Sequence, residues 1–109
     1  MSDAGQAEMT KLADALKQLE KEIPSDLNWI LRVDGHTDKD PILLGRQFSS
    51  NWELSSGRAT AVVKYLITQG VAPEHLAAAG FGEFQPLAPG DTEEAKAQNR
   101  RIELKLTEK

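Results

Sequence analysis

The sequence predicts an α+β domain in which helices cover one face of a small mixed sheet. The chain opens with an amphipathic helical pattern, short runs rich in aromatic and branched residues follow it, and helical segments alternate with these runs. This order points to an α+β or α/β sandwich, and we predict the α+β arrangement in two layers. At 109 residues the chain has the length of one domain, so we expect residues 1–109 to form a single compact unit.

The first half of the chain is predicted to form a helix, a strand and a loop. Residues 5–22 are predicted to be helical because apolar side chains recur at spacings of three and four: Met9, Leu12, Leu16, Leu19 and Ile23. Pro24 ends this helix, since proline has no amide hydrogen to donate. Residues 28–34 are typical of a buried strand, and the polar segment that follows, to about Ser50, is expected to be a loop.

A second helix is predicted to begin at Ser50 or Asn51. Ser50 can cap the amide of Glu53 while the Glu53 carboxylate reaches back, and Gly70 is placed to end the helix in a left-handed conformation. The apolar face of this helix is expected to contain Leu54, Ala61, Val62, Tyr65 and Leu66. Residues 76–82 are predicted to be extended, residues 92–98 to form a short helix, and residues 101–106, which alternate polar and apolar, to form a half-exposed strand.

Composition excludes several classes of function. A net charge of −4 is unfavourable for binding nucleic acid, which requires a basic surface. The chain has no cysteine, so it forms no disulfide and no thiolate metal site. No apolar run approaches the ~20 residues that span a bilayer. Because no leader or anchor precedes the first helix, we expect either a cytosolic protein or a piece of a larger one.

The stretch Asp34-Gly35-His36-Thr37-Asp38 has the side chains of a metal or acid–base site. In an extended segment, the alternating Asp34, His36, Asp38 and Asp40 would lie on one side, where they could bind a divalent ion. However, no second cluster with ligand-like spacing accompanies them, and Gly35 is unfavourable for uniform extended geometry. We therefore expect no metal and no cofactor. A metal-dependent hydrolase that uses Asp34, His36 and Asp38 is kept as the alternative.

Asp38 and Arg58 suggest a binding site instead. Asp38 lies on the loop before the second helix and Arg58 lies about two turns into that helix. A carboxylate suits a ligand ammonium, and a guanidinium can hold a ligand carboxylate through two parallel hydrogen bonds. Asp38 and Arg58 together could therefore bind a zwitterionic ligand, which has both an ammonium and a carboxylate. The alternative is that Asp38 and Arg58 form a surface ion pair, which contributes less than about 1 kcal/mol.

Four stretches carry a resemblance that covers residues 4–107: Val33 to Asp38, Asn51 to Ala59, Gly80-Phe81-Gly82 with Pro86, and Asn99 to Glu103. Together they resemble one family, the OmpA-like peptidoglycan-binding domain, in its MotB branch from bacterial motor stators. The family fold, βαβαββ, begins with a strand before the first helix, and we expect this strand to be missing here. Members bind peptidoglycan noncovalently and are not enzymes.

The resemblance implies particular roles for residues. The family's aspartate and arginine that hold the diaminopimelate of the stem peptide correspond to Asp38 and Arg58; Thr37, Asn51 and Leu54 would line the pocket and Arg100 would brace it. Two roles stay open for Asn99 and Arg100, direct contact with the ligand or a hydrogen-bonded start to the last strand. Gly35 and His36 would shape the loop, the glycine through an unusual backbone and the imidazole through a hydrogen bond.

The resemblance also implies a partner and a location. We expect an anchoring domain of a larger envelope protein in the periplasm, with peptidoglycan as its partner, a possible homodimer, and membrane attachment only through another segment. A protein-interaction module that keeps the fold is a further alternative.

Overall fold

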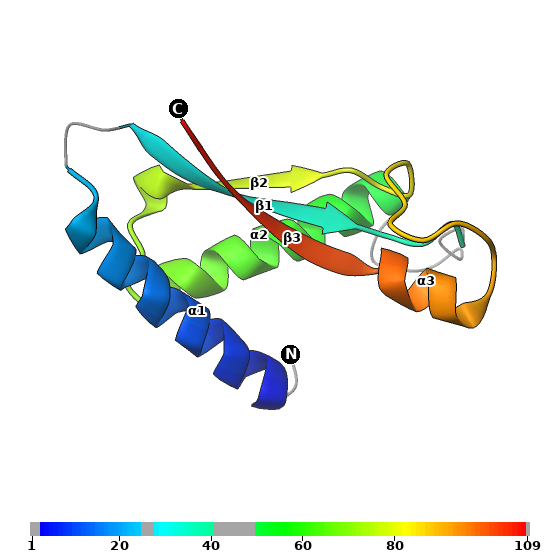
Figure 1. The fold of residues 1–109 in the computed structure, drawn as a ribbon, viewed down its shortest axis with the longest axis horizontal. Coiled ribbons are helices and arrows are strands. Elements are labelled where there is room, and N and C mark those ends of the chain that lie inside the picture. Colours follow the sequence, from blue (N-terminus) through cyan, green and yellow to red (C-terminus); the bar gives the residue numbers. More distant parts are fainter. Residues whose placement is uncertain (1–2, 25–27, 41–49, 109) are drawn as a thin grey trace.

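The computed structural model describes residues 3–24, 28–40 and 50–108, which form two layers (Figure 1). The elements are α1 (Asp3–Glu22), β1 (Trp29–His36), α2 (Asn51–Thr68), the 3-10 turn η1 (Pro73–His75), β2 (Leu76–Gly80), α3 (Glu93–Asn99) and β3 (Arg101–Glu108). Helices α1 and α2 lie on one face of the sheet, and α3 lies beyond its end. The predicted α+β arrangement is confirmed. Most of the predicted loop before Ser50, residues 41–49, lies outside the described residues.

The sheet is mixed, as predicted, and β1 is its central strand. Among the described residues it has three strands in the order β2-β1-β3. Strand β1 runs parallel to β2, with Val33 beside Ala78, and antiparallel to β3, with Val33 beside Leu104. In this order β1 is the one described strand that pairs with β3. Strand β3 is therefore an edge of the sheet as described.

Local signals set the ends of the helices. At the start of α2 the Ser50 hydroxyl accepts a hydrogen bond from the Glu53 amide at 3.5 Å, and it also donates to the Glu53 carboxylate. At its end Gly70 has a φ of 100°, the left-handed conformation that was expected. The hydroxyl of Thr92 caps α3 by accepting from the Ala95 amide at 3.1 Å.

The core lies between α1, α2 and the helix-facing side of β1. Its buried residues are Ala13, Leu16, Trp29, Leu31, Val33, Ala59, Val62, Leu66 and Val71. The predicted face of α2 is partly wrong, since Ala61 is exposed and Leu54 is half-buried, whereas Ser55 and Ala59 are fully buried. The small residues face the sheet because the backbones of α2 and the strands lie too close together for large side chains.

Gly35 and His36 belong to β1 and not to a loop, which corrects the sequence-based expectation. Gly35 does not have a positive φ. Close packing requires a glycine at this position, because a Cβ there would lie 2.1 Å from the backbone oxygen of Ser55 in α2. The strand continues through both residues because β2 pairs with Gly35 and β3 pairs with Gly35 and His36. The hydrogen bond expected for the His36 imidazole is not formed: neither ring nitrogen has a partner in the described part.

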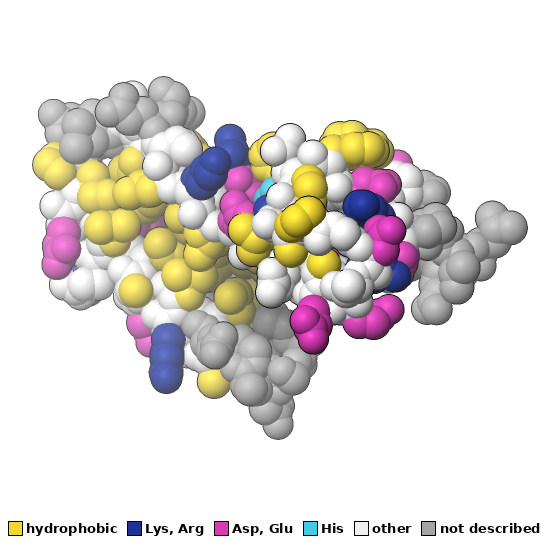
Figure 2. Space-filling model, turned by 45° about the vertical axis from the view of Figure 1, so that its right-hand side comes forward, with side chains coloured by type: hydrophobic (Ala, Val, Ile, Leu, Met, Phe, Trp, Pro, Cys, Tyr) yellow, Lys and Arg dark blue, Asp and Glu magenta, His cyan; other side chains and the backbone are white. Residues whose placement is uncertain are grey.

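Strand β3 leaves its apolar side chains more exposed than expected. Ile102, Leu104 and Leu106 are 36%, 38% and 55% exposed. Their partners Gly35, Val33 and Leu31 face α2, which packs beneath β1 and β2 rather than beneath β3. Hydrophobic side chains also gather in broad patches on the face shown in Figure 2. Among the described helices, none is long and apolar enough to cross a membrane.

Candidate functional site

The end of β1 is tied to α2 and to the loop after β2. The Thr37 amide donates to the Gly82 carbonyl at 2.9 Å, and the Thr37 hydroxyl donates to the Asp38 carbonyl at 2.9 Å. The side-chain amide of Asn51, the first residue of α2, donates to the carbonyls of Asp38 at 3.3 Å and Asp40 at 3.1 Å. Because these bonds come from separate elements, they fix the direction in which the Asp38 side chain leaves the backbone.

The carboxylate of Asp38 is bonded to Arg100. Arg100 Nη1 donates to Asp38 Oδ2 at 2.6 Å, and the Asp40 amide donates to Asp38 Oδ1 at 3.0 Å. The Asp38 side chain is 11% exposed and that of Arg100 is 41% exposed, so the carboxylate is largely buried and the guanidinium reaches the protein surface. A carboxylate offers about four lone-pair positions, so these contacts leave acceptor capacity for a ligand.

Arg58 is not part of that pair. It is exposed on α2, and within the described residues no hydrogen bond or ion pair holds its guanidinium. Leu54, one turn earlier in the helix, is half-buried. The alternative of a surface ion pair between Asp38 and Arg58 is therefore wrong, because Asp38 pairs with Arg100. Of the predicted site residues, Thr37, Asp38, Asn51 and Arg100 are joined by hydrogen bonds, and no hydrogen bond or ion pair joins these four to Arg58.

One further charged residue near Asp38, Lys96, was missed in the sequence. Lys96 Nζ lies 3.1 Å from Asp40 Oδ1, and this hydrogen bond raises the pKa of Lys96. Lys96 and Arg100 are four residues apart, a spacing that places side chains on the same side of a helix. That spacing was the signal in the sequence, and it brings two cations to the end of β1.

Asn99 has a structural role. Its Oδ1 accepts the amides of Leu87 at 2.8 Å and Ala88 at 2.9 Å, and its Nδ2 donates to the Ala88 carbonyl at 3.0 Å. The side chain is 2% exposed. Of the two roles that the sequence left open for this residue, hydrogen bonding within the fold is the one observed. It holds the loop between β2 and α3.

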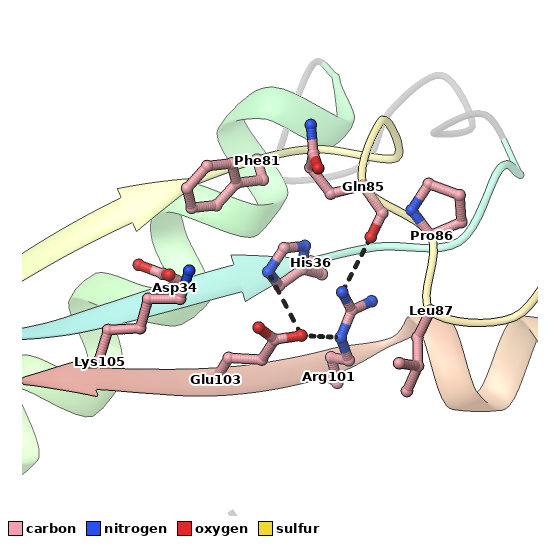
Figure 3. A pocket seen from close by; sticks show the side chains of 9 residues that line it. All are labelled: Asp34, His36, Phe81, Gln85, Pro86, Leu87, Arg101, Glu103 and Lys105. Carbon is pink, nitrogen blue, oxygen red and sulfur yellow. Dashed lines mark hydrogen bonds and ion pairs between the residues drawn. The ribbon is translucent and has the colours of Figure 1, made fainter.

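A separate cavity of about 240 Å³ lies on the face of the sheet opposite the helices (Figure 3). It is lined by Asp34, His36, Phe81, Gln85, Pro86, Leu87, Arg101, Glu103 and Lys105. His36 stacks on Phe81 with ring centroids 5.1 Å apart, and its Nε2 lies 4.0 Å from Glu103 Oε2, too far for a hydrogen bond. Burial lowers the pKa of His36, which favours the neutral imidazole.

The carboxylates of this cavity are bonded to arginines. Asp34 Oδ1 accepts from Arg32 Nε at 2.6 Å, and Glu103 is held by Arg101, which lowers the pKa of Glu103. In the part of the chain that the structure describes, no three or more His, Asp or Glu side chains are arranged to hold a metal. Asp34 and His36 both line this cavity, whereas Asp38 lies beyond it and is bonded to Arg100, so the alternation in the sequence does not gather the three side chains around one ion.

An exposed aromatic pair was also missed from the sequence. Trp52 follows Asn51 in α2, and its ring stacks on Phe84 from the loop after β2. Helix propensity and apolar spacing do not predict that a tryptophan in the first turn of a helix is exposed. The contact between the two rings also joins separate elements, so no local pattern predicts it.

The chain is similar to proteins of the bacterial cell envelope. It is 33% identical over 103 residues to Motility protein B of Helicobacter pylori, a match that covers 94% of this chain and 39% of that protein. It is 42% identical over 73 residues to the Peptidoglycan-associated lipoprotein of Pseudomonas aeruginosa, which covers 67% of this chain and 40% of the lipoprotein. The chain thus spans about two fifths of the length of the curated relatives it matches.

A solved structure has the same fold. The periplasmic domain of Helicobacter pylori MotB superposes with a TM-score of 0.81 at 29% identity, over 99% of this chain and 70% of that one. The sequence pattern of the OmpA family matches residues 1–100. The chain therefore belongs to the OmpA family.

Proposed function

We propose that this domain binds peptidoglycan noncovalently through the diaminopimelate of the stem peptide and anchors a larger envelope protein to the cell wall. The observation that carries the proposal is the Asp38 carboxylate, fixed at the end of β1 by Arg100 and the Asp40 amide. Membership of a family whose relatives include a peptidoglycan-associated lipoprotein supports the choice of ligand.

The free end of diaminopimelate has one ammonium and one carboxylate. Asp38 would accept hydrogen bonds from the ammonium, and Arg58, which pairs with no described residue, would donate two to the carboxylate. Thr37 and Asn51 would keep Asp38 in position, and the half-buried Leu54 would contact the aliphatic part of the ligand. Arg100 would balance the Asp38 charge while the site is empty.

Co-sedimentation with purified sacculi tests this function. The wild-type chain should pellet with sacculi that contain diaminopimelate and should release no soluble muropeptides. Sacculi in which lysine replaces diaminopimelate serve as the control for the ligand carboxylate, since lysine lacks it, and binding to them should be weaker. Release of fragments would favour the hydrolase alternative, and equal binding to both sacculi would contradict recognition of diaminopimelate.

Affinity for sacculi should fall as salt concentration rises. The ligand would be held by opposite charges at the surface, and the screening length shortens from about 10 Å at 0.1 M salt to about 3 Å at 1 M. Co-sedimentation across that range would measure the effect, with the thermal unfolding midpoint followed in parallel to exclude loss of the fold. Affinity that does not change with salt would contradict the ion-pair mechanism.

We propose that the chain is one domain of a longer protein and works in the periplasm. In the relatives the matching region takes about two fifths of the length, and the solved relative is a periplasmic domain. Peptidoglycan lies in the same compartment. A membrane anchor, if the full protein has one, would belong to a different segment.

The exposed edge strand β3 supports the possible homodimer, because a second copy of this strand could pair with it. Antiparallel pairing of two copies about Leu104 would place Glu103 opposite the partner's Lys105, and Ile102 opposite the partner's Leu106. Pairing about residue 103 or 105 would instead oppose like charges, and a shift by one residue would put apolar side chains opposite polar ones. Charge and hydrophobicity thus select one register for two copies of this strand.

Cysteine cross-linking tests that register, since the chain has no cysteine of its own. Leu104→Cys should form disulfide-linked dimers readily under mild oxidation, because the two cysteines face each other across the two-fold axis. Ile102→Cys alone should cross-link slowly, whereas a mixture of Ile102→Cys and Leu106→Cys should form the mixed dimer. A monomer by sedimentation, with no preference among these variants, would show that another occupant or solvent covers the strand.

A further inference from the structure

Trp52 and Phe84 present two large rings at the surface next to the proposed site. Their centroids lie 5.1 Å apart with planes at 27°, and the residues are 51% and 58% exposed. Such rings bury much apolar area when they pack in a core, so a stacked pair that remains half exposed indicates a contact surface.

The pair is built on the same backbone that positions Asp38. Gly82 lies between the rings and the site, and a Cβ at this position would lie 3.5 Å from both Trp52 and Phe84. Its amide donates to the Ser55 hydroxyl at 2.9 Å, and its carbonyl accepts from the Thr37 amide at 2.9 Å. The rings and the end of β1 are therefore held by one set of hydrogen bonds.

We propose that Trp52 and Phe84 form a shelf that binds a sugar ring of the peptidoglycan glycan strand. This rests on the proposed function and extends its ligand from the stem peptide to the saccharide. A pyranose ring presents a face of C–H groups with partial positive charge, which packs on the negative face of an aromatic ring, while its hydroxyls stay in water.

The covalent structure of the ligand places a sugar within reach. Two residues separate diaminopimelate from the muramic acid to which the stem is attached, so three steps of 3.3–3.6 Å, roughly 10 Å in an extended chain, join them. Trp52 directly follows Asn51, whose side chain bonds to the Asp38 carbonyl at 3.3 Å. A stem peptide held at Asp38 therefore brings its sugar into the neighbourhood of the shelf.

Calorimetry with two ligands tests the shelf: the free stem peptide and the same peptide attached to its disaccharide. The wild type should bind the disaccharide form about three- to tenfold more tightly, the gain expected of an aromatic contact. Trp52→Ala and Phe84→Ala should lose this gain and bind the free peptide as the wild type does. Ile67→Ala removes a partly exposed apolar side chain elsewhere on α2 and should leave both affinities unchanged.

Fluorescence gives an independent readout. The chain has two tryptophans, and Trp29 is buried, so a shift in emission on adding the disaccharide form should come from Trp52. The shelf is overturned if the wild type binds both ligands equally, or if Trp52→Ala weakens both equally. Peptide binding without a gain from the sugar would refute the shelf alone, whereas failure to bind either ligand would refute the proposed function as well.

Discussion

Asp38→Asn is expected to reduce the affinity for sacculi by about 30- to 700-fold. The change removes the negative charge but keeps the size of the side chain and an oxygen that can accept the Asp40 amide. The Asp38 side chain is only 11% exposed, and removing one partner of a largely buried, hydrogen-bonded charge pair costs about 2–4 kcal/mol, because the other charge remains without a partner. Here the ligand ammonium would lose its counter-charge, and Arg100 would lose its partner at 2.6 Å. Co-sedimentation or calorimetry with the stem peptide measures the loss.

This experiment must distinguish loss of ligand contacts from loss of the fold. Arg100 is 41% exposed, so solvent screens it and the Asp38→Asn variant should lose no more than about 1 kcal/mol of stability. Arg58→Ala should reduce binding by a similar factor without affecting stability, because no described residue pairs with Arg58. Lys64→Ala, which removes another exposed cation from α2, is the matched control and should bind normally. If both Asp38→Asn and Arg58→Ala still bind, the site lies elsewhere.

The sequence predicted the elements well because each has a local signal. Apolar spacing identified α1, Ser50 and Gly70 marked the ends of α2, and alternation identified β3. The end of β1 was misjudged, because glycine usually interrupts a strand. Here neighbouring strands supply the hydrogen bonds, and the backbone of Ser55 lies where a side chain of residue 35 would be. The separation between β1 and α2 depends on tertiary packing, so the local sequence does not predict it.

The sequence predicted residues of the candidate site but not which charged side chains pair with each other. Asp38 and Arg100 are 62 residues apart, and they meet because His36 is opposite Arg101 in the antiparallel register of β1 and β3. Register depends on the whole sheet, so neither charge patterning nor spacing could select Arg100 over Arg58 as the partner of Asp38. The same argument applies to Trp52 and Phe84, which meet only because the loop after β2 returns to the start of α2.

Gly35→Ala is expected to destabilise the fold more than any of the substitutions at the binding site. A methyl group at residue 35 would lie 2.1 Å from the Ser55 oxygen and 2.9 Å from the Ser55 carbonyl carbon, and both atoms belong to the backbone of α2. No side-chain rotation can relieve this contact, so β1 and α2 would have to move apart. Overpacking of this kind costs about 3 kcal/mol, at the upper end of the usual range. The thermal midpoint should therefore fall by about 10–20 °C.

Circular dichroism melting curves of Gly35→Ala and Gly90→Ala distinguish crowding from the general effect of replacing a glycine. Gly90 has nothing within 4 Å of its added Cβ, and its φ of +98° leaves only backbone strain, which costs about 1–2 kcal/mol. Gly35→Ala should be the less stable variant although its backbone suits alanine. It should also bind sacculi more weakly than Gly90→Ala, because the displaced strand carries Asp38 away from Asn51. If Gly35→Ala melts at the wild-type temperature, the close contact between β1 and α2 does not exist in solution, and the positioning of Asp38 by that contact must be abandoned.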